Sequence, residues 1–144
     1  MIKVVGAVIL DNVGNVIMGK RALTSKNFPD LFEFPGGKVE EGETEKEALR
    51  RELEEELNMD VDIEDMEEFE GNQSSHTVEN SGKIINLTLF IISKWEHSKG
   101  GIFGPKEGIH SGLERFNIKK MEEFTDVMIP GDAVFIPAIQ KYLN

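Results

Sequence analysis

Three glutamates are spaced so that they could hold a metal ion together. Glu52, Glu55 and Glu56 lie within a run of strong helix formers, and at this spacing their carboxylates share one face of a helix. Like charges three or four residues apart repel by about 0.2–0.5 kcal/mol per pair, and a hard divalent cation would remove that penalty. Carboxylate and carbonyl oxygens suit Mg²⁺ or Mn²⁺ rather than zinc.

The glutamates belong to the most acidic segment of the chain. Nine of the seventeen residues from 40 to 56 are glutamate. The segment follows Pro35, Gly36 and Gly37, and this sequence predicts a turn. On the acidic residues alone, a solvated helix face is the alternative to a cation site.

A helix must position these carboxylates, and the sequence marks both of its ends. Thr44 and Glu47 have the spacing of a capping box. From there to Leu57 the chain has neither proline nor glycine, and Asn58 can adopt the left-handed conformation that ends a helix. A stripe at i, i+4 and i+8 predicts the buried face of this helix: Leu49, Leu53 and Leu57.

The same segment has the spacing of a longer motif. It fits the pattern G-x5-E-x7-R-E-U-x-E-E-x-N-U, in which U is a bulky apolar residue: Gly37, Glu43, Arg51, Glu52, Leu53, Glu55, Glu56, Asn58 and Met59. The chain therefore resembles the Nudix hydrolases. It departs from their motif only at Asn58, which replaces a glycine and can take the same backbone conformation.

The resemblance implies a fold, a cofactor and a reaction. The fold is α/β, a mixed β-sheet sandwiched between helices. The cofactor is Mg²⁺, for which Mn²⁺ can substitute, and the reaction is attack of water on phosphorus in a diphosphate linked to another group. Glu43 and Arg51 would pair to brace the loop against the helix. The implied metal ligands are three carboxylates and a backbone carbonyl: Glu52, Glu55, Glu56 and Gly37.

Segments outside the motif resemble the MutT-type nucleoside triphosphate pyrophosphohydrolases. They are "VVGAVILDNVGNVIMGKR", "LFEFPGGKVEEGET", "GPKEG" and "PGDAVFIPAIQKYL". The implied substrate is a small (deoxy)nucleoside triphosphate, with an oxidised form such as 8-oxo-dGTP and a cytidine nucleotide as candidates. The products would be a monophosphate and diphosphate.

This second resemblance adds three site residues: Glu107, Arg21 and Asp132. Glu107 would reach the metals or the attacking water, and Arg21 would meet the substrate phosphates. Asp132 would contact the base; ionised, it only accepts hydrogen bonds, which favours guanine, its 8-oxo form and cytosine. Phe28 and Lys38 are further substrate-binding candidates. The alternatives are an ordinary loop glutamate for Glu107, a surface arginine for Arg21 and a helix N-cap for Asp132.

Other functions stay open. Hydrolases of ADP-ribose often have a proline, and those of dinucleoside polyphosphates a tyrosine, shortly after the motif; residues 72–80 contain neither. An mRNA-cap hydrolase, a non-catalytic nucleotide sensor and a structural cation-binding protein are the remaining alternatives. Loss of a motif glutamate would have favoured the sensor, and none is lost. We assign no chemistry to the histidines, which share no spacing: His76, His97 and His110.

Composition fits a single domain over 1–144. The chain is 39% hydrophobic and 30% charged, which is typical of a globular protein. It has no cysteine, which excludes disulfides and thiolate metal sites and suits a cytoplasmic location. A net charge of −11 argues against binding duplex nucleic acid. The apolar run at 1–10 is too short to span a membrane, and we expect a monomer or homodimer.

The remaining elements follow from residue patterns. Apolar alternation and turn signals predict strands, and the Gly-rich stretch at 97–112 predicts a loop. The predicted elements are a hairpin over 2–21, a short strand over 31–34, a strand with an acidic loop over 61–75, a long strand over 83–96, a short strand over 113–118, a turn or short helix over 119–126, and a turn followed by a helix over 130–143.

Overall fold

A computed structural model describes the chain except for residues 79, 98–103 and 105–108. The strands are β1 (Ile2–Leu10), β2 (Asn15–Arg21), β3 (Phe32–Glu33), β4 (Gly36–Lys38), β5 (Met59–Asp60), β6 (Met66–Glu67), β7 (Gln73–Thr77), β8 (Ile84–Ile92), β9 (Glu96–His97) and β10 (His110–Asn117). The helices are α1 (Glu45–Leu57), α2 (Pro130–Ala133) and α3 (Ile136–Leu143), with 3₁₀ helices η1 (Ile63–Asp65) and η2 (Ile118–Val127).

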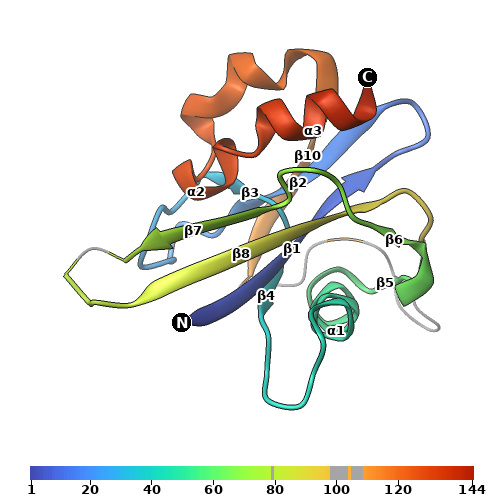
Figure 1. The fold of residues 1–144 in the computed structure, drawn as a ribbon. Helices are drawn as coiled ribbons and strands as arrows, with labels where there is room; N and C mark the ends of the chain where they lie inside the picture. The colour runs from blue at the N-terminus through green and yellow to red at the C-terminus, as the bar shows by residue number, and fades with distance from the viewer. Residues whose placement is uncertain (79, 98–103, 105–108) are drawn as a thin grey trace.

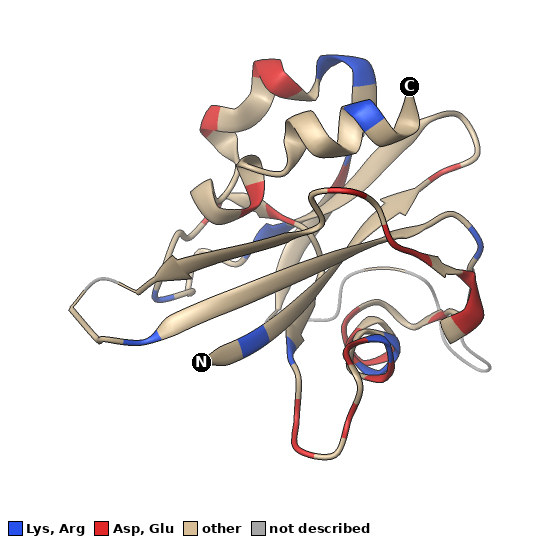
Figure 2. Ribbon diagram, in the orientation of Figure 1, with Lys and Arg blue, Asp and Glu red and all other residues tan. Residues whose placement is uncertain are grey.

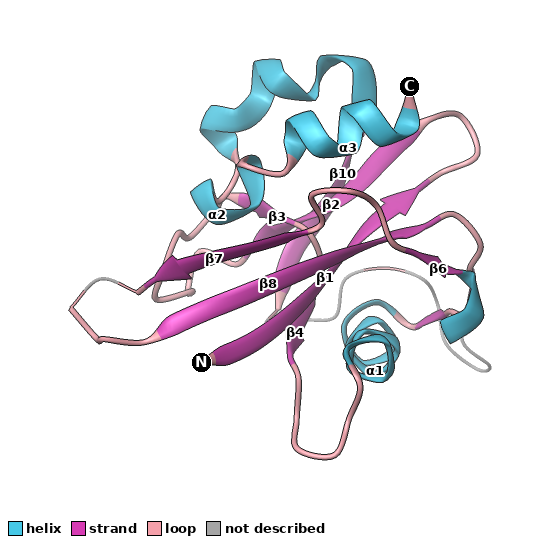
Figure 3. Cartoon of the chain, viewed as in Figure 1, coloured by secondary structure: helices cyan, strands magenta, loops and turns pink. Residues whose placement is uncertain are grey.

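Within the described residues, eight strands form one mixed sheet. Its main path runs β10-β2-β1-β8-β6, while β3 pairs with β2, β4 with β1 and β7 with β8. Figure 1 shows α1 on one side of this sheet and α2 and α3 on the other, and Figure 3 shows the same layers by secondary structure. The predicted α/β architecture, a mixed sheet between helices, is therefore confirmed.

The central strand β1 buries side chains on both faces of the sheet. It pairs in parallel with β8 and antiparallel with β2 and β4. Because successive side chains of a strand point to opposite faces, Val8 belongs to the core under α3, whereas Ile9 belongs to the core under α1. The predicted leucine stripe of α1 is fully buried in this second core: Leu49, Leu53 and Leu57.

The predicted ends of α1 are confirmed. Thr44 is its N-cap, and both reciprocal hydrogen bonds of the capping box with Glu47 are present. Asn58 ends the helix with φ 55° and ψ 41°, the left-handed conformation that the sequence predicts. The substitution of glycine by asparagine therefore leaves helix termination intact.

The predicted turn at Gly36 and Gly37 is wrong. Both residues belong to β4, which pairs with β1 at Val5 and Gly6, and neither has a positive φ. A Cβ atom on Gly36 would lie 1.9 Å from the carbonyl oxygen of Val5. Gly36 is therefore needed for close approach of two backbones rather than for a turn.

Other predicted boundaries shift. The segment 61–75 forms η1, β6 and the start of β7 rather than one strand, because Gly71, with φ +85°, turns the chain before β7. The long strand ends at Ile92 instead of 96, and the residues after it form the short β9. The last strand starts earlier than predicted, at His110. The predicted loop at 97–112 lies mostly outside the described residues.

The C-terminal segments agree in type. Residues 119–126 lie in a 3₁₀ helix, and the final segment holds two helices, α2 and α3. Ile136 and Ile139 of α3 are buried against the sheet. Among the described residues, no helix has the length and apolar character that crossing a membrane requires.

Candidate active site

Strand β4 lies directly against the acidic face of α1. The backbone N–H of Gly36 donates a hydrogen bond to Oε2 of Glu56 at 3.1 Å. A Cβ atom on Gly37 would lie 2.4 Å from the carboxyl carbon of Glu52. Two glutamate side chains of α1 therefore reach the backbone of the sheet at two adjacent glycines, and a larger residue at Gly37 would displace Glu52.

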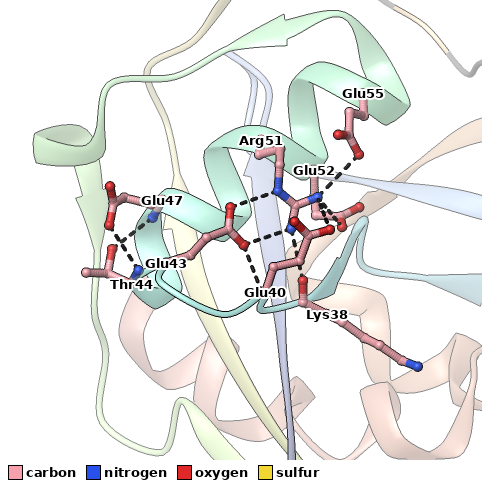
Figure 4. Close-up of polar contacts among 8 residues, drawn as sticks. All are labelled: Lys38, Glu40, Glu43, Thr44, Glu47, Arg51, Glu52 and Glu55. Carbon is pink, nitrogen blue, oxygen red and sulfur yellow. Dashed lines mark hydrogen bonds and ion pairs between the residues drawn. The ribbon is translucent and has the colours of Figure 1, made fainter.

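Arg51 ties the loop before α1 to this face. Its guanidinium donates two hydrogen bonds to Glu43, from Nε to Oε2 at 2.8 Å and from Nη2 to Oε1 at 2.9 Å. It also contacts Oε1 of Glu52 at 2.9 Å and the carbonyl oxygen of Lys38 at 3.1 Å. Figure 4 shows these contacts converging on one guanidinium. The pairing that the sequence predicts for Glu43 and Arg51 is present.

The carboxylates differ in their proton affinities. The hydrogen bonds from Arg51 lower the pKa of Glu43 to about 2. Burial raises the pKa of Glu52. Burial, and then the nearby negative charges of Glu52 and Glu33, raise the pKa of Glu56 to about 8. Glu56 is only 9% exposed, so its ionised form lacks the water that would stabilise it.

The donor set suits a hard divalent cation. Within the described residues, no three histidine or acidic side chains form a ready ligand set, because Arg51 contacts Glu52 and Glu55. The side chain of Glu55 is 58% exposed, so it can rotate away from Arg51 at little cost. A cation beside Glu52 and Glu56 would also stabilise the ionised forms that burial disfavours.

A cavity of about 450 Å³ adjoins this face. Its wall includes residues of β1, β2, β3, β4, β8, α1 and α2, among them Arg21, Glu33, Gly37, Lys38, Glu56 and Asp132. A larger hollow, of about 580 Å³, lies beside Glu47 and Glu54 and includes none of the three predicted carboxylate ligands. Figure 2 shows the acidic residues of the β4–α1 loop and of α1 gathered on one side of the sheet. The smaller cavity is therefore the candidate substrate site.

Known proteins are similar to this chain in sequence and fold. The NUDIX domain family matches residues 2–138.

The chain belongs to the Nudix family. It is 34% identical over 96 residues to 8-oxo-dGTP diphosphatase of Haemophilus influenzae, an alignment that covers 66% of this chain and 65% of that protein. It is 32% identical over 131 residues to CTP pyrophosphohydrolase of Escherichia coli, an alignment that covers 86% of this chain and 91% of that protein. The solution structure of the Escherichia coli ORF135 protein is similar with a TM-score of 0.75 and 30% identity, over 98% and 89% of the chains.

These comparisons confirm the predicted family and fold. In this Nudix chain, the residues of the motif run from β4 through the loop and α1 to Asn58, the C-cap of α1, and Met59 of β5. The glycine carbonyl and the three carboxylates predicted as ligands lie on neighbouring elements, whereas Glu107 lies outside the described residues.

Asp132 lies in the wall of the Nudix cavity, and its environment differs from the prediction. It belongs to α2 and not to the N-terminus of α3, whose N-cap, Phe135, makes no side-chain cap hydrogen bond. Oδ2 of Asp132 accepts from the N–H of Phe34 at 2.9 Å. The side chain is buried, which raises its pKa to about 7. Near neutral pH a protonated Asp132 can therefore also donate a hydrogen bond, in addition to the acceptor role expected of its ionised form.

Of the other predicted substrate-binding residues, Arg21 and Lys38 line the cavity and Phe28 does not. Arg21 lines the cavity, with Nη1 bonded to Oε1 of Glu33 at 3.1 Å. Lys38 also lines it, and Figure 4 shows its side chain pointing away from Arg51. Phe28 is 48% exposed and does not line the cavity. Sequence reasoning missed Glu33, whose one signal is a charged residue within the otherwise apolar run 31–34.

Replacing Arg51 by alanine should lower both stability and turnover. The variant loses the two bonds to Glu43 and the contact with Glu52, so the loop before α1 is no longer held. We expect a lower melting temperature and turnover reduced by about 10–100-fold, the usual effect of removing a residue that orients a metal ligand. Arg51→Lys keeps the charge but not the forked geometry, and should restore little. A variant that is inactive but as stable as wild type in thermal unfolding would contradict the predicted loss of stability.

Asp132→Asn should change how stability depends on pH. The folded pKa of Asp132, about 7, exceeds its ordinary value of 3.8, so the folded state binds the proton more tightly. Protonated Asp132 therefore contributes to the stability of the fold. This contribution is fully present below about pH 4 and is lost as pH rises through about 7. Asparagine cannot ionise and keeps an acceptor for Phe34, so the variant should gain on wild type by on the order of a few kcal/mol between pH 4 and pH 8. Urea unfolding at both pH values measures this; a constant difference would refute it.

Proposed function

We propose that this Nudix chain hydrolyses a (deoxy)nucleoside triphosphate to a monophosphate and diphosphate, with Mg²⁺ as its cofactor. The observation that supports this most is the packing of Glu52 and Glu56 against the β4 glycines at the edge of the cavity. The names of the relatives, an 8-oxo-dGTP diphosphatase and a CTP pyrophosphohydrolase, favour 8-oxo-dGTP and cytidine triphosphates as the first substrates to test.

The residues of this chain divide the work. Glu52, Glu55, Glu56 and the carbonyl of Gly37 would hold the cation, and Glu107 would assist them as a ligand or a base. When bound, a divalent cation neutralises phosphate charge and makes water a better nucleophile. Arg51 orients Glu52 and ties the loop to α1.

Other residues of the cavity wall would bind the nucleotide. Arg21 lines the cavity and would bind phosphate oxygens, with Lys38 as a second cation. Asp132 would contact the base, accepting hydrogen bonds when ionised and also donating one when protonated. This gives the cavity a cationic region for the phosphates and a carboxyl group for the base.

The function is tested with a panel of nucleotides. The four deoxynucleoside triphosphates, 8-oxo-dGTP, CTP, ADP-ribose, a dinucleoside polyphosphate and a capped RNA are incubated with Mg²⁺ or Mn²⁺, and products are separated and identified. We expect monophosphate and diphosphate from at least one triphosphate, and no turnover in excess chelator. Undiminished turnover with chelator would refute the role of the cation. Nucleotide binding without turnover would favour the sensor instead.

A further inference from the structure

A buried histidine contacts the cavity wall from the far side of a strand. The side chain of His110, the first residue of β10, is fully buried. Its Nε2 lies 3.0 Å from Oε2 of Glu33, a residue of β3 that lines the cavity. His110 itself does not line the cavity walls that the described residues form.

Gly19 makes this contact possible. Strand β2 lies between β10 and β3, and its Gly19 pairs with Glu33. A Cβ atom on Gly19 would lie 2.6 Å from Cδ2 of His110, so the imidazole occupies the space of the missing side chain. The ring therefore crosses β2 to reach Glu33, and no residue larger than glycine would permit it without displacement.

Both oxygens of the Glu33 carboxylate are engaged. Oε1 accepts from Nη1 of Arg21 at 3.1 Å, and Oε2 faces Nε2 of His110. Since an ionised carboxylate only accepts hydrogen bonds, this contact is a hydrogen bond when the imidazole proton is on Nε2. Nδ1 of His110 is buried with no hydrogen-bond partner among the described residues. The ring is therefore oriented by its single bond to Glu33.

We propose that His110 is a positioning residue, which holds Glu33 so that Glu33 in turn aims the Arg21 guanidinium into the nucleotide cavity. Nε of Arg21 is also fixed, by the carbonyl oxygen of Asn27 at 3.0 Å, so the orientation of the guanidinium depends on these two acceptors. The ligand group that it serves is an anionic phosphate of the substrate. This role rests on the proposed nucleotide hydrolysis.

Steady-state kinetics on wild type and matched variants test this role. His110→Phe keeps a ring of similar size but has no donor, whereas His110→Gln can place an amide donor near the position of Nε2. We expect His110→Phe to raise KM for the best triphosphate by about 5–10-fold, the effect of losing one hydrogen bond of typical strength, with kcat within about 2-fold. His110→Gln should restore KM. Exposed His97, which does not line the cavity, provides the control His97→Phe.

A double-mutant cycle shows whether His110 acts through Glu33. Glu33→Gln by itself should raise KM. Adding His110→Phe to Glu33→Gln should then change KM by less than about 2-fold, because coupled residues give non-additive effects. Multiplicative effects would overturn the proposal. So would an unchanged KM in His110→Phe, or a loss of kcat and melting temperature without a change in KM, which would indicate a purely structural histidine.

An NMR measurement examines the contact without catalysis. Long-range ¹H–¹⁵N spectra of the imidazole should show the proton of His110 on Nε2, and Glu33→Gln should shift that signal. A proton on Nδ1 alone would overturn the proposal even if His110→Phe were impaired. If wild type neither cleaves nor binds a nucleotide, the proposed function fails and this role fails with it. If wild type acts on nucleotides and His110→Phe matches it, only the positioning role fails.

Discussion

Glu56→Gln should reduce turnover by more than about 100-fold while leaving the fold intact. Removing residues that merely orient a metal ligand already costs about 10–100-fold, so loss of a direct ligand should cost more. Glutamine has nearly the same volume and keeps an oxygen that can accept from Gly36. Because burial raises the pKa of Glu56 to about 8, the metal-free protein already favours a neutral side chain there, and its melting temperature should not fall.

The control for this variant comes from the same helix. Glu54 is exposed and is not one of the predicted ligands, so Glu54→Gln removes the same charge without touching the proposed cation site. We expect its kcat to stay within about 2-fold of wild type, as for most surface substitutions. Both variants are compared by kcat at saturating Mg²⁺ and by thermal unfolding. Retention of more than half of wild-type activity by Glu56→Gln would remove it from the ligand set.

Alanine substitutions at the two β4 glycines should separate folding from catalysis. At Gly36 the new Cβ would meet backbone atoms of β1, which no rotamer change can relieve. We expect a loss of about 3 kcal/mol or more, at the upper end of overpacking effects. At Gly37 the new Cβ would meet only the carboxyl end of Glu52, which can move. That variant should fold, but it should lose most of its turnover because Glu52 is displaced.

A third glycine provides the control for both. A Cβ atom on Gly112, in β10, would have no heavy atom within 4 Å, so Gly112→Ala should be close to wild type in both stability and kcat. Urea unfolding and steady-state kinetics on the three variants give the comparison. If Gly36→Ala were as stable as Gly112→Ala, or if Gly37→Ala kept full activity, then β4 would not pack on α1 as described.

Local features were predictable from sequence, and features that depend on contacts between distant segments were not. The capping box of Thr44 and Glu47 and the leucine stripe of α1 involve neighbours a few residues apart, so spacing alone identifies them. Gly36 and Gly37 were interpreted as a turn because glycine often supplies a positive φ. Their actual use depends on segments elsewhere in the sequence: Gly36 lies against the backbone of β1, and Gly37 lies against the side chain of Glu52.

The same limit applies to the site. The motif placed the carboxylates on one helix face, because their spacing is fixed by helix geometry. It could not show that Glu33, on β3, meets His110, on β10, because that contact exists only when β2 lies between them. The burial of Asp132 was equally hidden, because a carboxyl group is buried by the elements that pack around it rather than by its own neighbours in the sequence.

The position of β1 has a consequence for how the chain reaches this fold. Ile2 pairs with Ile85 and Ile9 with Ile92, so the central parallel pair closes a loop of roughly eighty residues, whose entropy opposes early formation. Such non-local pairing slows folding. On the ribosome, β1, β2 and α1 emerge well before β8, and the apolar surface of β1 stays without its central partner until then. The acidic face of α1 therefore becomes ordered late, when β8 completes the sheet that supports it.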